Sequence, residues 1–422
     1  MSAITQSPAP QQNQERRLET RGPVADAVRP SGRCVRITAT TVVDAARGLA
    51  PELSERALEN EQRRTMAPDL IDKMRAAGLF HLGLPAELGG LECDPITILD
   101  TIEELSRADG AAGWTASIGN GTSFFAWLDP EVAKEIVSHR TDFITAGAFA
   151  PTGTAQTNGA DLVVDGRWTF VSGCSHADWL FTGVIVTDGD GPRQVSPGRP
   201  DWRFAVYPAS EATIHDTWHV AGLRGTGSHD VSTQKVRVPA ERTMMPFFEP
   251  ARFDGPLYRL PFPTLLMSLF AGVPLGIARR ALDEFGALAA TKSRNLSAGS
   301  TMVEDPAIQV ELARAEAAVR AARAFVVEAV GTAWDTVVAG DELGLASRAN
   351  VTLATVNAAR SARAAVDAVF AMAGAGALFD DNPLQRCARD LMAATQHLAL
   401  SLGQWKTVGR VLFGLDPASQ MI

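Results

Sequence analysis

The spacing of apolar residues changes twice along the 422-residue chain, and this order restricts the possible folds more than any other feature. From about 40 to 140 apolar residues recur at helical intervals, whereas from about 143 to 240 they alternate as in short strands. After Pro261 the helical intervals return. A Rossmann or barrel enzyme alternates strands and helices throughout, so both folds are disfavoured.

These patterns predict a mainly α protein with a β middle domain. The four predicted parts are a flexible tail at 1–36, an α-helical domain at 37–141, a β middle domain at 142–250 and a C-terminal helical bundle at 251–422. Helices are expected near 40–62, 67–78, 94–108, 262–290, 304–340, 344–375 and 383–413. Asp-Gly turns are expected between strands at Asp165-Gly166 and Asp188-Gly189.

Charge and cysteine content exclude several classes of partner. The chain has 39 basic and 48 acidic residues, a formal net charge of −9, so a concentrated basic face for nucleic acid or an anionic membrane is not expected. No uninterrupted apolar run approaches the roughly 18 residues that cross a bilayer. The cysteines, Cys34, Cys93, Cys174 and Cys387, lie far apart without a CxxC pair, which indicates reduced thiols in a cytoplasmic protein.

Three short patterns resemble catalytic or metal motifs but fail on their spacing. Gly374-Ala375-Gly376 follows a helical pattern and has Phe379 where a dinucleotide fingerprint needs glycine. Ser228-His229-Asp230 holds triad residue types, yet adjacent strand residues point to alternate faces. His215 and His219 have a helical metal spacing in a strand-and-turn segment, so no metal site is expected. Electrons from NAD(P)H would therefore have to arrive on a carrier.

The segment from Arg167 to Trp179 combines aromatic rings, hydroxyls and glycine at the end of one strand and the start of another. A planar ligand could rest against such a ledge while hydroxyls or backbone amides bind its edge. The same residues could equally serve ordinary strand packing.

Taken with two later segments, Trp218–Val231 and Asn382–Asp390, this ledge resembles the acyl-CoA dehydrogenase superfamily. More narrowly, it resembles the two-component flavin-dependent monooxygenases of that fold, over roughly residues 40 to 415. The resemblance implies an N-terminal helical domain, a β-barrel-like middle domain and a C-terminal four-helix bundle. It also implies a separate NAD(P)H-dependent flavin reductase as partner and a homotetramer or homodimer.

The two branches of this superfamily differ in a catalytic carboxylate. A dehydrogenase needs a base that removes the proton α to a thioester carbonyl, and in that branch the base is a glutamate at one of two positions. Residues 391–415 contain no Asp or Glu, and Gln396-His397 occupies the candidate position. Residues 255–282, the other location, contain none either. The dehydrogenase reading is therefore disfavoured.

A monooxygenase has the opposite need. Reduced flavin adds O2 at C4a, and the hydroperoxide survives only where water and stray acids are excluded, so imidazole and hydroxyl groups suit it better than carboxylates. The resemblance places His397 beside flavin and substrate, as base on the substrate or as holder of the peroxide. It places Ser172 near flavin N5.

Further site residues follow from the same resemblance. The implied cofactor contacts are Trp168, Thr169, Ser172, Gly173, Arg224, Thr226, Ser228 and Arg386. The implied substrate contacts are Asn120, Thr122, Ser123, Phe149 and His397. Several aromatic hydroxylases of the family carry a histidine in the helix after the Gly-Trp pair, but Thr115 to Phe125 contains none, so N-, S- or indole-type oxygenation stays open.

FMN is favoured over FAD because the Arg-x-x-Phe-Gly pattern that holds the ADP half of FAD is missing around Lys292 to Leu296. The expected function is oxygenation of an aromatic or heteroaromatic molecule with reduced FMN or FAD and O2. Two alternatives remain open: an acyl-CoA dehydrogenase with a displaced base, and a non-catalytic flavin- or ligand-binding protein.

Overall fold

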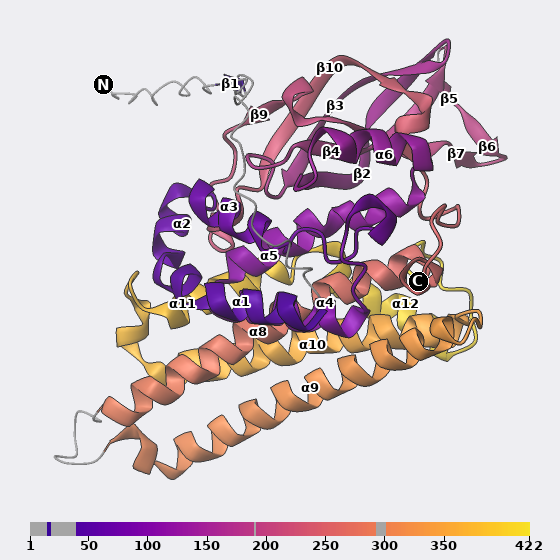
Figure 1. Ribbon diagram of the computed structural model, residues 1–422. Coiled ribbons are helices and arrows are strands. Elements are labelled where there is room, and N and C mark those ends of the chain that lie inside the picture. The colour runs from indigo at the N-terminus through magenta and orange to yellow at the C-terminus, as the bar shows by residue number, and fades with distance from the viewer. Residues whose placement is uncertain (1–14, 18–38, 190, 293–300) are drawn as a thin grey trace, which may run out of the picture.

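The computed structural model describes residues 15–17, 39–189, 191–292 and 301–422. Figure 1 shows a sheet domain that lies on two groups of helices, one from the N-terminal third of the chain and one from the C-terminal third. Most of the predicted tail at 1–36 lies outside the described residues. Its one described piece, β1 (Glu15–Arg17), pairs with β9 (Thr213–His215).

The N-terminal helices are short and are started by local chemistry. They are α1 (Ala39–Glu55), α2 (Ala57–Arg63), α3 (Pro68–Ala76), α4 (Pro95–Ala108), α5 (Gly110–Gly119) and α6 (Pro130–His139), followed or interrupted by the 3-10 turns η1 (Ala86–Leu88) and η2 (Asn120–Trp127). Asp94 and Asp129 accept backbone N–H groups of the first turns of α4 and α6, and a proline follows each at the first helical position. The same combination fixes where each helix begins.

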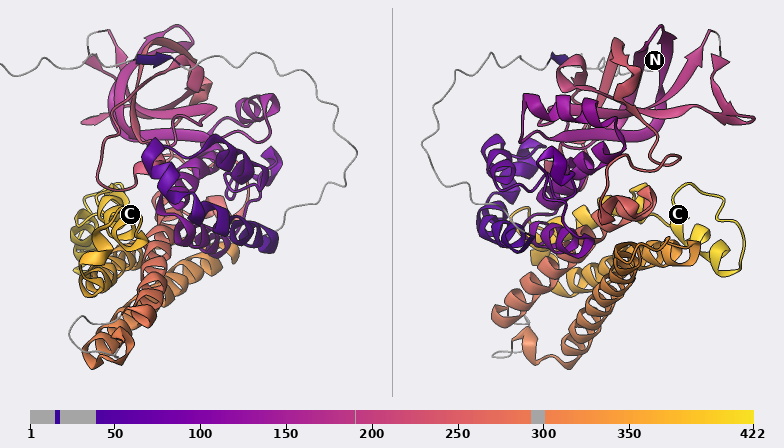
Figure 2. Two further views of the ribbon diagram at one scale, coloured as in Figure 1. Left: turned by 90° about the vertical axis from the view of Figure 1, so that its left-hand side faces the viewer. Right: turned by 45° about the vertical axis from the view of Figure 1, so that its right-hand side comes forward.

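The middle of the chain forms a sheet of nine strands among the described residues. The main strands are β2 (Thr145–Asn158), β3 (Asp161–Val171), β4 (Trp179–Asp188), β8 (Trp202–Pro208), β9, β10 (His229–Pro239) and β11 (Thr243–Met244). Their order is β1-β9-β10-β3-β2-β4-β8-β11, and the short β5 (Gly191–Pro192) pairs with β4. Only β2 and β4 pair in parallel among these strands. In Figure 2 the strands curve round a common interior.

The predicted turn at Asp165-Gly166 is wrong, because both residues lie inside β3. Gly166 is needed there for space, since a Cβ would lie 2.7 Å from Gly153 Cα on the neighbouring β2. The turn at Asp188-Gly189 is confirmed: β4 ends at Asp188, and Gly189 has a positive φ of 61°. A small hairpin of β6 (Gln194–Ser196) and β7 (Arg199–Pro200) follows.

The C-terminal helices pack round one buried helix. They are α7 (Pro256–Arg259), α8 (Phe262–Thr291), α9 (Pro306–Val338), α10 (Leu345–Ala373), α11 (Pro383–Ala394) and α12 (Gly403–Leu412). The helix α8 packs against α4, α10 and α11. Its length and hydropathy would suit a membrane span, but 89% of its most apolar window is buried inside the protein, as in a core helix.

The expected single helix at 383–413 is wrong. The chain leaves the helical path after Ala394, makes the 3-10 turn η8 (Leu398–Leu400) and starts again as α12. The expected fold class is confirmed: along the chain, one set of helices precedes the β middle domain and another follows it. Cys93, Cys174 and Cys387 are buried free thiols, and Cys34 lies outside the described residues.

Candidate active site

A row of buried hydroxyl groups lies where the sheet meets the N-terminal helices. Ser172 Oγ lies 2.7 Å from Ser228 Oγ, and Ser228 Oγ lies 2.6 Å from Thr226 Oγ1. At one end Trp114 Nε1 donates to Ser172 Oγ at 3.0 Å, and at the other Thr226 Oγ1 donates to Leu223 O at 2.8 Å. We call Ser172, Ser228 and Thr226 the hydroxyl chain.

The two ends fix the direction of every hydrogen bond in the hydroxyl chain. Each hydroxyl has one proton, and Thr226 gives its proton to Leu223 O. Ser228 therefore donates to Thr226, and Ser172 donates to Ser228. Ser172 Oγ is left with one acceptor position beyond the bond from Trp114. The hydroxyl chain thus offers a hydrogen-bond acceptor and no spare donor at Ser172.

A bulge between β3 and β10 turns the chain at this point. His229 pairs with Val171 and Val231 with Trp168, so two residues, Thr169 and Phe170, stand opposite one residue of β10. Phe170 has a φ of 60°, and the residue is 69% exposed. The left-handed backbone at a bulky residue is strained, and it reverses the alternation, so that Val171 rather than Phe170 is buried in the core of the sheet.

Phe170 was not among the predicted site residues, yet it lies beside the hydroxyl chain. Strand alternation puts it on the same side as the buried Trp168, which predicts a core residue. The bulge instead presents its ring to solvent two residues before Ser172, edge-on to Trp218 with 6.1 Å between ring centroids. Only the three-dimensional structure shows this ring as an open aromatic surface beside the hydroxyl chain.

His397 stands in the break between α11 and α12. Its Nδ1 accepts the backbone N–H of Ala399 at 3.3 Å, so the ring proton of the neutral imidazole is on Nε2. The ring packs edge-on against Trp114 and tilted against Phe270, with 5.2 Å and 4.5 Å between ring centroids. Burial lowers the pKa of His397 to about 4, so the imidazole is neutral at pH 7.

The surroundings of His397 are aromatic rather than charged. Burial is the cause of its lowered pKa, and among the described residues no charged side chain contributes to the shift. Trp114 joins this imidazole to Ser172, because its ring packs on His397 while its Nε1 binds Ser172. The structure therefore brings His397, Ser172, Ser228 and Thr226 together through a residue that was not predicted for the site.

Trp168 was predicted to frame a flavin ring, and this prediction is wrong. Its side chain is only 1% exposed in the core of the sheet, and its Nε1 donates to Gly183 O at 2.8 Å. The neighbouring Thr169 is exposed on the bulge. Gly173 has a φ of 72° and donates its N–H to Thr226 O at 2.9 Å, beside the hydroxyl chain. Cofactor contacts of Thr169 and Gly173 stay predictions.

Asn120, Thr122 and Ser123 were predicted to contact substrate, and this is wrong as well. All three are fully buried, and they bind backbone groups instead. Asn120 accepts from Leu82 N and donates to Leu79 O, each at 2.8 Å, while Thr122 donates to Phe80 O at 2.7 Å. Ser123 donates to Asn120 O at 2.7 Å. Their polar atoms serve to hold the local backbone.

The remaining predicted contacts lie near the site or in a separate cluster. Arg224 Nε lies 3.9 Å from Glu61 Oε1, and Arg386 on α11 acts electrostatically on the buried Asp109. Phe149 is half-buried in an aromatic cluster at the start of α8. Its ring partners are Phe124, Phe181, Phe204, Phe247 and Phe262. Ligand contacts of Arg224, Arg386 and Phe149 stay predictions.

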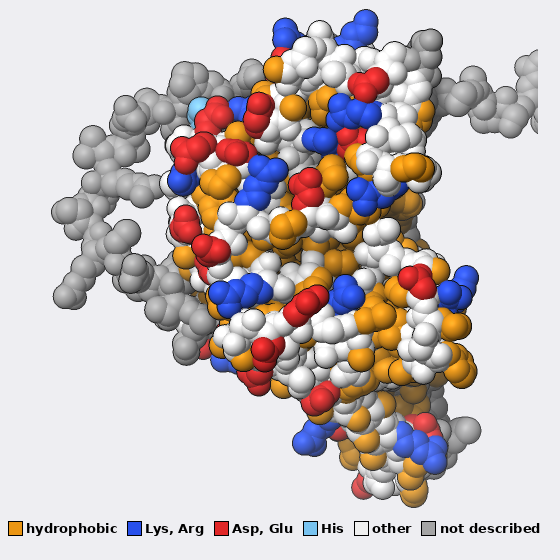
Figure 3. All heavy atoms as spheres, turned by 90° about the vertical axis from the view of Figure 1, so that its right-hand side faces the viewer, with side chains coloured by type: hydrophobic (Ala, Val, Ile, Leu, Met, Phe, Trp, Pro, Cys, Tyr) orange, Lys and Arg blue, Asp and Glu red, His pale blue; other side chains and the backbone are white. Residues whose placement is uncertain are grey.

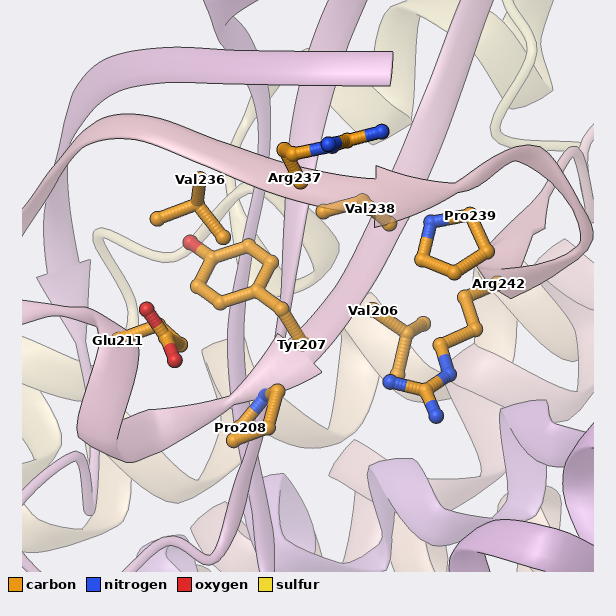
Figure 4. A pocket seen from close by; sticks show the side chains of 9 residues that line it. All are labelled: Val206, Tyr207, Pro208, Glu211, Val236, Arg237, Val238, Pro239 and Arg242. Atoms are coloured by element: carbon orange, nitrogen blue, oxygen red, sulfur yellow. The ribbon is translucent and has the colours of Figure 1, made fainter. Parts of the chain in front are cut away.

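Two cavities among the described residues lie away from the hydroxyl chain. One of about 240 Å³ lies between β8 and β10, as Figure 4 shows, and its walls include Tyr207, Glu211 and Arg237. The other, of about 270 Å³, borders Arg203 and Met244. Neither cavity is lined by His397 or by the hydroxyl chain.

The residues at the hydroxyl chain suit a flavin. A reduced flavin carries an N–H at N5, and Ser172 offers an acceptor for it, while the exposed ring of Phe170 offers an aromatic face. Thr115 Oγ1 is buried without a hydrogen-bond partner among the described residues, and its Cγ2 lies 3.7 Å from where a Cβ on Gly173 would be. In residues 39–189, 191–292 and 301–422, no group of three or more His, Cys, Asp or Glu could hold a metal ion.

Comparison with known proteins gives a consistent family. Residues 38–129 match the acyl-CoA dehydrogenase N-terminal domain, and residues 268–402 match the acyl-CoA dehydrogenase C-terminal domain. The chain is 34% identical to an indole-3-acetate monooxygenase of Pseudomonas putida over 359 residues, which cover 85% of this chain and 90% of that protein. It is 30% identical over 362 residues to HsaA, a flavin-dependent monooxygenase oxygenase subunit of Rhodococcus jostii, covering 83% and 92%.

A solved structure gives the same result. The crystal structure of the HsaA monooxygenase from M. tuberculosis superimposes with a TM-score of 0.84 at 28% identity, covering 91% of this chain and 100% of that one.

Proposed function

Because the chain belongs to the flavin-dependent monooxygenases that share the acyl-CoA dehydrogenase fold, we propose that it oxygenates an aromatic or heteroaromatic small molecule. The single observation that supports this most is the setting of His397: a neutral imidazole among aromatic rings, joined through Trp114 to the hydroxyl chain. Such a setting provides no carboxylate to abstract a proton from a thioester.

When bound, a reduced flavin supplies the electrons that activate O2 for transfer of one oxygen atom. The chain's own residues would hold and orient it: Ser172 would accept a hydrogen bond from N5–H, and Phe170 would offer an aromatic face to the ring system. Gly173 and Thr115 lie beside the same position. FMN is the proposed flavin, with FAD as the alternative, because the Arg-x-x-Phe-Gly pattern that holds the ADP half of FAD is missing near Lys292.

His397 is proposed as the catalytic residue that donates a hydrogen bond. Its Nδ1 is occupied by Ala399 N–H, so Nε2 presents a proton rather than a lone pair. A pKa of about 4 also makes it a weak base at neutral pH. Of the two roles considered, holding the transferred oxygen therefore fits this tautomer better than abstracting a proton from the substrate. The rings of Trp114 and Phe270 cover part of the half-buried imidazole.

The proposed substrate class follows from the aromatic surroundings and from the relatives. Trp114 and Phe270 are buried and pack on each other beside His397, with 5.4 Å between their ring centroids, so the imidazole has aromatic neighbours. The name of the Pseudomonas putida relative gives indole-3-acetate as a substrate of that enzyme. We propose an indole-like or other heteroaromatic molecule, with oxygenation at carbon, nitrogen or sulfur.

The relative HsaA is named as an oxygenase subunit, which supports a separate flavin reductase as the partner that supplies reduced flavin. We also propose a homotetramer or homodimer, in the cytoplasm, that forms through the C-terminal helices. Large apolar side chains are exposed there: Leu378, Phe379, Leu398, Leu402, Leu412 and Phe413. Figure 3, which looks at the side that lies on the right in Figure 1, shows hydrophobic side chains gathered over the helical part of the molecule. Exposed apolar patches of this kind mark interfaces.

The experiment that tests this function supplies the purified chain with chemically reduced FMN or FAD in air. Indole-3-acetate and a panel of phenols, indoles and thiophenes serve as substrates, and products are identified by mass spectrometry. An oxygenated product without any reductase present is expected. Bleaching of an oxidised flavin by an acyl-CoA would instead establish the dehydrogenase alternative, and no oxygen uptake under any supply of reduced flavin would establish a binding protein.

A further inference from the structure

The hydroxyl chain depends on a tight turn that is wedged between helices. Leu223 has a φ of 52°, and Gly227 has a φ of 56°. A Cβ on Gly222 would collide with Arg389 O on α11, and a Cβ on Gly225 would lie 2.9 Å from Ala111 Cβ on α5. The turn from Gly222 to Gly227 therefore has backbone contact with helices from both ends of the chain.

One buried carboxylate holds this turn from outside. Asp390 on α11 is 5% exposed, and its Oδ1 accepts the backbone N–H of Leu223 at 2.6 Å, across 167 residues of sequence. The carbonyl oxygen of Leu223 accepts from Thr226 Oγ1 at 2.8 Å and from Trp218 Nε1 at 3.1 Å. Leu223 thus links Asp390 on one side to the hydroxyl chain on the other.

We propose that Asp390 is a positioning residue for the hydroxyl chain: by accepting the N–H of Leu223, it holds the left-handed turn that sets Thr226 and Ser228 against Ser172. The helix that carries Asp390 ends at Ala394 and leads directly to His397. One hydrogen bond therefore keeps the two halves of the site, the imidazole and the hydroxyls, in register. The effect of this role on catalysis rests on the proposed function, whereas the role in holding the turn does not.

Three charged groups act on Asp390: Asp109 at the start of α5, and Arg386 and Arg389 on α11. The ion pair of Arg280 with Glu284 on α8 acts on Cys387, which precedes Asp390 on α11. Glu61 is paired with Arg389 at 2.5 Å. Asp109 accepts from Ala111 N at 3.0 Å and from Asn60 Nδ2 at 3.2 Å.

Burial, and then the nearby Asp109, raises the pKa of Asp390 to about 7. Its charge therefore changes across neutral pH. An ionised carboxylate accepts a hydrogen bond more strongly than a protonated one. The hold on Leu223 should strengthen as the pH rises from 6 to 8, which gives the positioning role a signature that a purely structural contact lacks.

Hydrogen–deuterium exchange of the flavin-free protein, followed by mass spectrometry, tests this role. Asp390→Ala is expected to speed exchange in peptides covering 222–228 by about tenfold, the scale of a lost hydrogen bond to a charged acceptor, with α9 unchanged. Asp390→Asn keeps the shape and an acceptor oxygen, so it folds if the alanine variant does not. Asp367→Asn, on α10 in an exposed ion pair with Arg363, is the matched control.

In the wild type, protection of 222–228 corrected for intrinsic exchange is expected to rise between pH 6 and pH 8, whereas in Asp390→Asn it stays flat. Product formed per reduced flavin oxidised should fall at least fivefold in Asp390→Asn. Unchanged exchange in both Asp390 variants, or an equal pH dependence in wild type and Asp390→Asn, would overturn the positioning role. Loosening of the turn together with no oxygenation by the wild type would leave the positioning intact and reject the proposed function.

Discussion

Trp114 binds both halves of the site: its Nε1 donates to Ser172 Oγ at 3.0 Å, and its ring meets the His397 ring edge-on with 5.2 Å between centroids. The indole therefore fixes the distance between Ser172 Oγ, whose remaining position is an acceptor, and the imidazole of His397, whose Nε2 is a donor. This complementary pair is the chemical basis of the predictions below.

Replacement of His397 by Ala should slow oxygenation by about a hundredfold, the scale of a lost donor at a developing charge, while flavin affinity changes less than threefold. The imidazole touches aromatic rings and is not placed to carry the flavin's binding energy. Single-turnover product formation and a flavin titration separate the two effects. His219→Ala, 65% exposed on a loop, is the control. Equal losses in both measurements would make His397 a structural residue.

Ser172→Ala should release more hydrogen peroxide for each reduced flavin oxidised. The substitution removes the acceptor at the end of the hydroxyl chain and leaves Trp114 Nε1 without its partner. Because this buried donor loses its partner, the free energy of unfolding should also fall by about 1–3 kcal/mol. Peroxide is measured with a coupled peroxidase, and Ser232→Ala, whose hydroxyl binds His215 at 2.8 Å, is the matched control. An unchanged peroxide yield would remove Ser172 from the site.

Phe170→Gly should weaken flavin binding about tenfold without lowering the melting temperature. Glycine relieves a left-handed backbone that costs a bulky residue about 1 kcal/mol, and the exposed ring contributes little burial. Lys235→Gly is the matched control, because Lys235 has a φ of 52° and is exposed on β10. That variant should gain stability and keep its flavin affinity. Unaltered affinity in Phe170→Gly would show that the ring does not contact flavin.

Stability should depend on the protonation of His397 in one pH window. Burial lowers its pKa from 6.5 to about 4, so below pH 6.5 the unfolded chain binds a proton that the folded chain does not. The free energy of unfolding therefore falls as the pH drops from 6.5 to 4, and this contribution is absent above pH 7. His397→Gln should flatten part of that slope in urea titrations at several pH values. The same slope in variant and wild type would mean that His397 titrates normally.

The long helices could be predicted from the sequence because their apolar stripes are continuous. The stripe from Ile308 to Val330 predicts α9, and Ile308, Val326 and Val330 are indeed buried. The break at 395–402 could not be predicted, since no proline or glycine interrupts the pattern between Ala394 and Leu402. That break is what places His397 beside Trp114.

The ledge was predicted in outline and misassigned in detail. Ser172, Ser228 and Thr226, each predicted as a cofactor contact, lie together in the hydroxyl chain, whereas Trp168 is buried and Phe170 is exposed because a bulge interrupts the alternation between them. A bulge depends on the register of two strands that are distant in sequence, so the sequence of one strand does not reveal it. Asn120 was misassigned for a related reason. The residue type alone does not distinguish a buried amide that binds local backbone from one that binds a ligand.

The central claim is that an uncharged aromatic setting round His397 couples flavin oxidation to oxygen transfer, and one matched pair of variants tests it. The ring centroids of Phe270 and His397 lie 4.5 Å apart. Phe270→Glu therefore introduces a carboxylate beside the imidazole, and Phe270→Gln introduces a side chain of the same shape without a charge. The measurement is product formed per reduced flavin oxidised in a single turnover at pH 7.5, on variants shown to be folded. We predict that Phe270→Glu forms about tenfold less product than Phe270→Gln, with the balance as hydrogen peroxide. Equal coupling in the two variants would contradict the account.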